Sequence, residues 1–310
     1  MNDPCVSVVM SVHNCQKYVG QAIRSVLGQT FRDFEFIIMN DASTDRTGRV
    51  IASFSDERMR VFHHSHNEGL TRSLIEGIAH SRSPYIVRID ADDLSHPMRI
   101  EVLHGILAKD PQIGVAGSFV EFMTSHGKTY WKWELPQDHG SLRRRFLMGE
   151  SFSHGATMFR KDLYEKAGGY RPQFIFGQDL DLWLRMSEHC RVTVADQFLY
   201  RQRRSPDRLT TRNLHRQTQY LLLALVLTEQ RLRKGKDCLQ ADSRANEEEL
   251  FKMVWEHYRS NDREFFQRYI LKSSDKIEYE LRSGGKYFRS LLIKAQTKSL
   301  LKKFRKFCGI

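Results

Sequence analysis

The segment YIVRIDADD, at residues 85–93, places three aspartates within four positions directly after an apolar run. The run itself has the composition of a strand that is buried on both faces. Carboxylates this close repel one another and raise one another's pKa, so the cluster costs stability unless positive charge lies beside it. The segment therefore predicts a buried strand that ends at a site for a cation.

Strand-like and helix-like patterns alternate along the chain up to this segment. Apolar, β-branched runs predict strands at 6–12, 34–39, 59–62 and 85–89, and apolar residues at helical spacing predict helices at 18–27, 46–54 and 69–79. The alternation predicts an α/β fold with βαβ units and a mostly parallel sheet, covered by helices on both faces. Ligands bind such sheets at the carboxyl ends of the strands, where His13, Asn14, Asp41 and the aspartate cluster all fall.

The pattern continues after Pro97 with less regular spacing. It predicts a helix at 98–108, a strand at 113–122 paired with 130–133, a helix at 179–187, and two short edge strands at 192–194 and 198–201. From residue 209 onward the sequence is polar, rich in Arg, Gln and Glu, and helical in pattern. We therefore expect one α/β domain at residues 1–205 and a basic helical extension at residues 206–310.

The charge of the chain favours anionic partners. Lys and Arg number 49 against 37 Asp and Glu, a formal net charge of +12 that suits nucleic acid, anionic lipid or phosphorylated small molecules. The five cysteines are scattered and odd in number, as expected for reduced thiols. The first residues lack a signal-peptide pattern, and the longest apolar run, 221–227, is too short to cross a bilayer. We expect a cytoplasmic protein.

Two readings compete for the aspartate cluster. Carboxylate oxygens are hard ligands that suit Mg²⁺ or Mn²⁺, and a metal–nucleotide complex would supply the missing positive charge. Alternatively, the aspartates cap the helix that follows Pro97, although a cap uses one Asp and not three. Asp41 ends another strand and can accept a hydrogen bond from a base or a ribose, but taken alone its segment is an ordinary Asx turn.

Together these segments resemble the family 2 glycosyltransferases of the GT-A fold, over roughly residues 6–203. Five motifs carry the resemblance in the family's order: VSVVMSVHN at 6–14, DASTDRT at 41–47, NEG at 67–69, DAD at 90–92 and GQDLDLWLR at 177–185. Each motif is weak by itself, whereas the five in this order and spacing are specific.

The resemblance implies a role for each matching position. Ser11, His13, Asn14 and Asp41 would hold the base and ribose of a nucleotide, and Asp90 would approach the ribose. Asp92 would bind the Mg²⁺ or Mn²⁺ ion on the diphosphate. A divalent metal can stabilise the negative charge that grows on a leaving diphosphate.

The late acidic motif implies the chemistry of the acceptor. Asp179 would be the general base that takes the proton from an acceptor hydroxyl as it attacks the anomeric carbon, with inversion. The chain departs from the family in two places, because Gln178 stands where Glu is usual and His13 where Tyr is frequent. His154 either contacts the acceptor or diphosphate or is structural.

Three tryptophans near these motifs have a packing interpretation. Trp183 falls on the core face of its helix, so we expect it to pack. Trp131 and Trp133 share one face of a strand, where they either stack on sugar or pack across strands, with packing the favoured reading.

The function predicted on these grounds is an inverting, metal-dependent glycosyltransferase. It would move a sugar from a nucleotide diphosphate, taken as UDP, to a saccharide or lipid-linked acceptor, as in bacterial surface polysaccharide synthesis. An inactive nucleotide-sugar-binding protein is the alternative. Nucleic acid is not an expected partner, because no binding signature accompanies the charge. The basic, amphipathic segment 298–307 either touches the inner face of a membrane, self-associates or is solvated.

Overall fold

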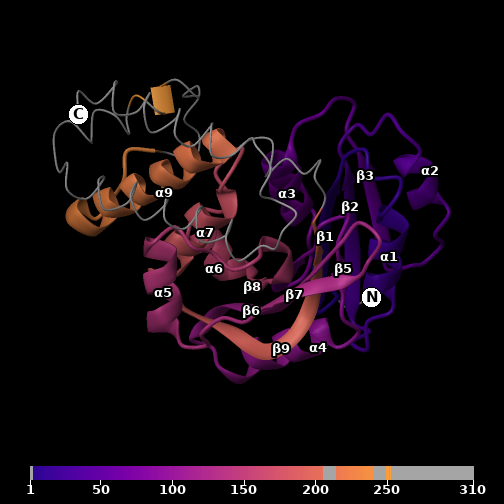
Figure 1. Cartoon of the computed structure of the whole chain (residues 1–310), viewed down its shortest axis with the longest axis horizontal. Coiled ribbons are helices and arrows are strands. Elements are labelled where there is room, and N and C mark those ends of the chain that lie inside the picture. Colours follow the sequence, from indigo (N-terminus) through magenta and orange to yellow (C-terminus); the bar gives the residue numbers. More distant parts are fainter. Residues whose placement is uncertain (1–2, 205–213, 240–248, 251, 253–310) are drawn as a thin grey trace. The chain divides into compact units, whose positions relative to one another are not determined.

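The structure is built on one mixed β-sheet with helices packed against it (Figure 1). The computed structural model describes residues 3–204, 214–239, 249–250 and 252. Its first half alternates strand and helix: β1 (Val6–Val12), α1 (Val19–Leu27), β2 (Phe34–Asn40), α2 (Thr47–Ala52), β3 (Met59–His63), α3 (Leu70–Ala79) and β4 (Tyr85–Arg88). Each predicted strand and helix of this half is present, with ends that differ by a few residues.

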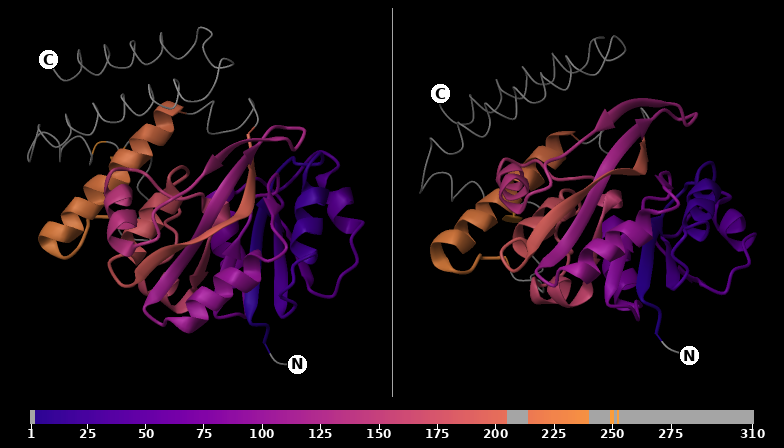
Figure 2. Two further views of the ribbon diagram at one scale, coloured as in Figure 1. Left: turned by 60° about the horizontal axis from the view of Figure 1, so that its bottom comes forward. Right: turned by 90° about the horizontal axis from the view of Figure 1, so that it is seen from below.

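The second half is less regular. Its elements are β5 (Leu94–Ser95), α4 (Arg99–Lys109), β6 (Ile113–Met123), β7 (Thr129–Trp133), α5 (His139–Leu147), η1 (His154–Ala156), β8 (Met158–Arg160), α6 (Lys161–Lys166), α7 (Gln178–Met186), β9 (Arg191–Arg203) and α9 (Leu214–Lys234). The predicted β6–β7 hairpin is confirmed, and β6 and β7 lie side by side with β9 in both views of Figure 2.

The strand order is β3-β2-β1-β4-β8-β6-β9-β5, with β7 paired to β6. The four strands β3, β2, β1 and β4 are parallel, which brings their carboxyl ends to one edge of the sheet. β8 is antiparallel to both β4 and β6, and β9 returns parallel to β6. The carboxyl ends of β1, β2 and β4 therefore share an edge, as the sequence predicted.

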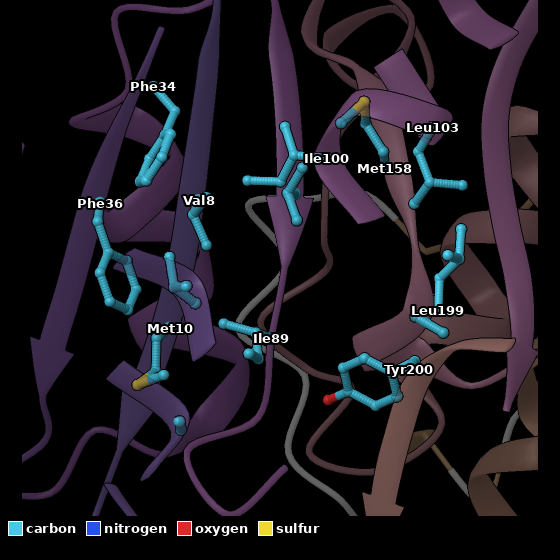
Figure 3. Close-up of a cluster of buried hydrophobic side chains, with 14 of the residues drawn as sticks. Val8, Met10, Phe34, Phe36, Ile89, Ile100, Leu103, Met158, Leu199 and Tyr200 are labelled. Carbon is cyan, nitrogen blue, oxygen red and sulfur yellow. The ribbon is translucent and has the colours of Figure 1, made fainter. Parts of the chain in front are cut away.

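The sheet core explains the apolar runs. All seven residues of β2 are buried, and Val8 and Met10 of β1 pack with Phe36 in the cluster of Figure 3. Helix α3 approaches this sheet closely at Gly77. A Cβ on that residue would lie 2.8 Å from Val9 and 3.1 Å from Met39. Gly77 thus sets the distance between α3 and the strands β1 and β2.

One element differs from its prediction. Two short edge strands were expected at 192–194 and 198–201, but β9 is a single strand of 13 residues that carries β5 on its outer side. Register shifts near Ser118 and Phe119 of β6 absorb the irregularity that the sequence pattern suggested as a break. The edge-strand prediction is therefore wrong, because local bulges interrupt the alternation without ending the strand.

Helix α9 lies after the predicted domain boundary. Residues Met1–Phe251 cluster as one unit, in which α9 packs on α7. The division at residue 205 and the helical extension beyond it stay predictions. The basic segment 298–307 lies outside the described residues. Within the described part of the chain, no helix is both long and apolar enough to span a bilayer.

Candidate functional site

The aspartate cluster forms a loop between β4 and β5 whose three carboxylates have different environments. Asp93 is fully buried and points inward, where its two oxygens accept hydrogen bonds from the Tyr200 hydroxyl at 2.8 Å and from the Arg203 backbone N–H at 2.6 Å. Both donors come from β9. Asp93 is therefore a structural residue that ties the loop to the sheet, whereas Asp90 and Asp92 are partly exposed.

The first positive charge at the cluster belongs to the protein. Arg88, at the end of β4, is 2% exposed and forms an ion pair with Asp90. Burial alone would lower the pKa of Arg88, but the Asp90 carboxylate outweighs it and the pKa is raised. Sequence reasoning gave Arg88 no role, although a charged residue within an apolar strand was a visible signal. Part of the positive charge that the aspartate cluster needs is therefore supplied by the buried Arg88 guanidinium.

A divalent metal still fits the loop. Asp93 is excluded because both of its oxygens accept hydrogen bonds inside the protein, so the candidate ligands are the partly exposed Asp92 and Asp90. One or two carboxylates are the usual protein share of a Mg²⁺ or Mn²⁺ site on a nucleotide, where phosphates and water complete the shell. The described residues contain no group of three or more His, Cys, Asp or Glu placed to hold a metal by themselves.

The loop after β1 lies beside the loop after β2. The Asn14 side-chain oxygen accepts hydrogen bonds from the backbone N–H groups of Thr44 and Asp45, at 2.8 and 3.3 Å. The His13 ring donates to the Asp41 carbonyl at 2.6 Å. Asn14 has a φ of 50°, a conformation in which Asn is far better tolerated than bulky residues. His13 and Asn14 are exposed, and Ser11 is partly buried at the end of β1.

Asp41 has a structural task. Its side chain is 3% exposed and accepts hydrogen bonds from the backbone N–H groups of Glu68 and Gly69, at 2.8 and 2.9 Å, and from His64 at 2.8 Å. Gly69 has a φ of 84° and precedes α3. Asp41 therefore binds the NEG motif at 67–69 and fixes the start of α3. A direct contact of this carboxylate with a nucleotide stays a prediction.

Asp179 lies in the first turn of α7, after Gly177 with its left-handed φ of 63°. Burial raises the pKa of the Asp179 carboxyl, and the neighbouring Asp90 raises it further, while Arg88 acts in the opposite direction. The same three side chains therefore interact electrostatically although they come from β4, its following loop and α7. Gln178 is buried beside Asp179 at the start of the helix.

Asp181, two residues further along α7, has a different role. It is fully buried and receives two hydrogen bonds from Arg185, at 3.1 and 2.5 Å, with Arg171 at 3.6 Å. These two cations outweigh burial and lower the pKa of Asp181. Asp181 anchors the helix that carries Asp179, and the sequence motif alone did not separate these roles.

His154 joins the same neighbourhood. Its Nε2 shares a 2.6 Å hydrogen bond with the Tyr170 hydroxyl, and its ring lies edge-on to Trp183 with centroids 6.2 Å apart. Burial lowers the pKa of His154 well below its ordinary value, and Arg88 lowers it further, so the imidazole is neutral near pH 7. Trp183 is fully buried, which confirms its predicted packing role.

The aromatic face of β7 packs on β6. The Trp131 ring stacks on Phe122 with centroids 4.8 Å apart and an interplanar angle of 15°, and it also stacks against Trp133. Trp131 nevertheless keeps 49% of its surface exposed. Cross-strand packing, the favoured reading of these tryptophans, is therefore present.

The fold and the polar strand ends define a class of protein. The architecture is the GT-A fold, an α/β fold with a largely parallel sheet, and the sequence prediction of this fold is confirmed. The chain belongs to glycosyl transferase family 2, whose model matches residues 7–168, just over half of its length.

Relatives of known sequence match in the N-terminal part. An uncharacterised glycosyltransferase of Haemophilus influenzae is 32% identical over 151 residues, which are 46% of this chain and 47% of that protein. EpsE of Bacillus subtilis is 35% identical over 118 residues, or 37% of this chain and 42% of EpsE. The chain thus spans less than half the length of these relatives.

Solved structures extend the likeness in fold. Staphylococcus aureus TarS, residues 1–349 in complex with UDP-GlcNAc, superposes with a TM-score of 0.60 at 13% identity, covering 84% of this chain and 74% of that one. The mannosyltransferase PcManGT of Pyrobaculum calidifontis, in complex with GDP-Man and Mn²⁺, has a TM-score of 0.55 at 16% identity and covers 100% of this chain and 82% of its own. At these identities the likeness concerns the fold alone.

Proposed function

We propose that the chain is an inverting, metal-dependent glycosyltransferase that moves a sugar from a nucleotide diphosphate to an acceptor hydroxyl. The observation that carries the proposal is the meeting of Asp90 and Asp179 around Arg88, because it places a donor-side and an acceptor-side carboxylate in one neighbourhood. Such a transfer needs these two functions separately. One side stabilises the leaving diphosphate and the other accepts the proton of the attacking hydroxyl.

The donor would bind at the carboxyl ends of β1, β2 and β4. His13 and Asn14 are exposed on a loop that hydrogen bonds and a left-handed residue hold in place, which suits contact with a base and a ribose. Ser11 lies near the end of β1, the strand that leads into this loop. Asp41 would act in this site through the 67–69 loop that it fixes, with Asp90 near the ribose.

The diphosphate would lie over the outer face of the aspartate loop. Asp92, with the outer side of Asp90, would hold Mg²⁺ or Mn²⁺, which when bound supplies positive charge to the leaving diphosphate. Arg88 adds a fixed cation beneath the loop. Because Asp93 is used within the protein, the loop keeps its shape while Asp92 stays accessible.

Asp179 would accept the proton of the acceptor hydroxyl. The raised pKa of Asp179 makes it a stronger base than an ordinary carboxylate. Burial disfavours its charged form and so favours uptake of a proton. His154, neutral and hydrogen bonded to Tyr170, together with Gln178, would shape the surroundings of the acceptor or the diphosphate. The attack would come from the face opposite the leaving group, which inverts the anomeric carbon.

The donor and the acceptor are proposed from the comparisons with known proteins. The complexes of TarS with UDP-GlcNAc and of PcManGT with GDP-Man and Mn²⁺ support a nucleotide-sugar donor, for which we propose a UDP-sugar. For the acceptor we propose a saccharide or lipid-linked molecule of bacterial polysaccharide synthesis, at the cytoplasmic side of a membrane, as the family membership allows. Liposome flotation with and without residues 298–307 tests the membrane contact, which is excluded if truncation leaves binding unchanged.

A melting-temperature screen tests the donor proposal. A ligand that binds only the folded state raises the melting temperature, so the Tm with UDP-sugars and Mn²⁺ should exceed the Tm without them. Incubation with oligosaccharide acceptors should then release UDP. Binding without release by either transfer or hydrolysis would favour the alternative of an inactive nucleotide-sugar-binding protein, for which Gln178 in place of the usual Glu is the main support.

A further inference from the structure

The end of β9 carries a guanidinium that joins three separate parts of the proposed donor site. Arg203 Nε donates to the Asp92 carbonyl at 2.8 Å, and Nη1 donates to the carbonyls of Thr124 and Ser125 at 3.3 and 2.9 Å. Nη2 donates to the Gln21 side chain at 3.1 Å. The aspartate loop, the turn between β6 and β7, and helix α1 are thereby held by one side chain.

Arg203 is not placed to contact a ligand itself. Its side chain is 2% exposed, its guanidinium lies over the Tyr18 ring at 4.3 Å, and four of its five N–H groups have acceptors. The acceptors are neutral oxygens, so the residue does not neutralise one carboxylate as Arg88 does. Its contacts fix backbone positions, and the backbone it fixes most directly is that of Asp92.

Arg203 holds the aspartate loop through both its backbone and its side chain. The backbone N–H of Arg203 donates to Asp93 at 2.6 Å, while its side chain holds Asp92, so consecutive residues of the loop are fastened to one residue of β9. The inward side of the loop is therefore occupied by protein. Asp92 itself is partly exposed, whereas Asp93 is buried.

We propose that Arg203 is a positioning residue, which fixes the backbone at Asp92 so that this carboxylate faces the metal-bound diphosphate; this rests on the proposed function. A planar guanidinium is required because its four acceptors lie in three different parts of the chain, and a lysine ammonium on a flexible stem cannot reach all of them together. Partners of metal ligands typically change metal affinity by about 10- to 100-fold when they are mutated. Arg203 would act on Asp92 in this way.

The test compares Arg203→Lys with the matched variant Arg201→Lys. Arg201 lies two residues earlier on β9 and binds the same turn through the Gly127 carbonyl and Thr129, and its ion-pair partner is Glu121 of β6 and not a residue of the aspartate loop. Binding of UDP is measured by calorimetry in MnCl₂ and in EDTA. For Arg203→Lys we expect about 10-fold weaker binding in MnCl₂ with unchanged binding in EDTA. For Arg201→Lys we expect wild-type values in both.

Hydrogen exchange of the ligand-free protein provides a readout that needs no nucleotide. Backbone amides at residues 90–93 and 124–128 should exchange faster in Arg203→Lys than in wild type, and the 90–93 amides should be unchanged in Arg201→Lys. Wild-type exchange and wild-type UDP affinity in Arg203→Lys overturn the proposal, and so does an equal loss in MnCl₂ and EDTA. If wild type binds no UDP or GDP with Mn²⁺, the proposed function fails, while the exchange data still decide the role of Arg203 in the loop.

Discussion

The Tyr200 hydroxyl donates a 2.8 Å hydrogen bond to the Asp93 carboxylate across 107 residues of sequence. The same hydroxyl accepts a 3.1 Å hydrogen bond from the backbone N–H of Asp90. Gly155 leaves the room that this arrangement needs, because a Cβ there would lie 2.0 Å from the Tyr200 oxygen. One buried hydroxyl thus joins β9 to both ends of the aspartate loop.

Replacement of this hydroxyl should destabilise the protein. Tyr200→Phe leaves the buried Asp93 short of a donor and the Asp90 N–H without its acceptor, which costs about 1–3 kcal/mol of unfolding free energy. Urea denaturation measures the loss. The exposed Tyr130 provides the control, since Tyr130→Phe should stay within about 0.5 kcal/mol of wild type. Equal midpoints for the two variants would contradict the proposed importance of the Tyr200 bonds.

Asp179→Asn should separate catalysis from binding and stability. Asparagine keeps the shape but cannot accept the proton, so kcat should fall by about 10²- to 10⁴-fold while UDP affinity is retained. The raised pKa of Asp179 adds a stability effect. A carboxyl whose pKa is raised on folding loses stability as pH rises through that pKa, so at neutral pH the variant should melt no lower than wild type.

Asp181→Asn is the contrasting variant on the same helix. Here the pKa is lowered by Arg185 and Arg171, so the ionised carboxylate stabilises the fold. Its loss removes the carboxylate that faces the buried Arg185, whereas Arg171 keeps its ion pair with Asp237. We expect a lower Tm for Asp181→Asn and a smaller effect on kcat than for Asp179→Asn. Normal turnover in Asp179→Asn would show that Asp179 is not the general base.

The sequence was informative where the pattern of one segment decides its structure. The strands β1, β2 and β4 are mostly apolar because they are buried on both faces, so their ends and the polar residues after them could be placed from the pattern. The helices α1 and α3 likewise show their apolar face at regular spacing. The location of the candidate site at one sheet edge follows from these elements.

Roles that depend on distant partners could not be read in the same way. Asp90, Asp92 and Asp93 are neighbours in sequence, yet only β9, more than 100 residues later, turns Asp93 inward. The helix-fixing contacts of Asp41 could not be predicted either, because they are formed by the backbone N–H groups of residues 68–69, which have no sequence signature. Arg203 was overlooked for the same reason, since its acceptors are mostly carbonyl oxygens.

The ion pairs of His64 should give the protein a specific pH dependence. Burial lowers the pKa of His64, but the hydrogen bond to Asp41 and the charge of Glu76 outweigh burial and raise it. A raised histidine pKa means that the stabilisation is complete below the unfolded value of about 6.5 and is lost as pH rises through the folded value.

Melting curves of wild type and His64→Gln check this expectation. The Tm difference between them should be largest near pH 6 and shrink toward about pH 9, since all other titrating groups are common to both proteins. The exposed His126, which lies outside these ion pairs, provides the control variant His126→Gln. A His64→Gln difference that grows with pH would show that the ion pairs do not control the titration.

Asp92→Asn should weaken metal-dependent donor binding without harming the fold. Asp92 is partly exposed, so its loss should leave the Tm of the ligand-free protein nearly unchanged, whereas UDP binding in MnCl₂ should weaken by about 10-fold or more. Asp93→Asn, by contrast, should lower the Tm of the ligand-free protein, because the buried Asp93 accepts hydrogen bonds from Tyr200 and Arg203. EDTA should remove transfer in the wild type. Full transfer in chelator, or unchanged Mn²⁺-dependent affinity in Asp92→Asn, would exclude Asp92 as the metal ligand.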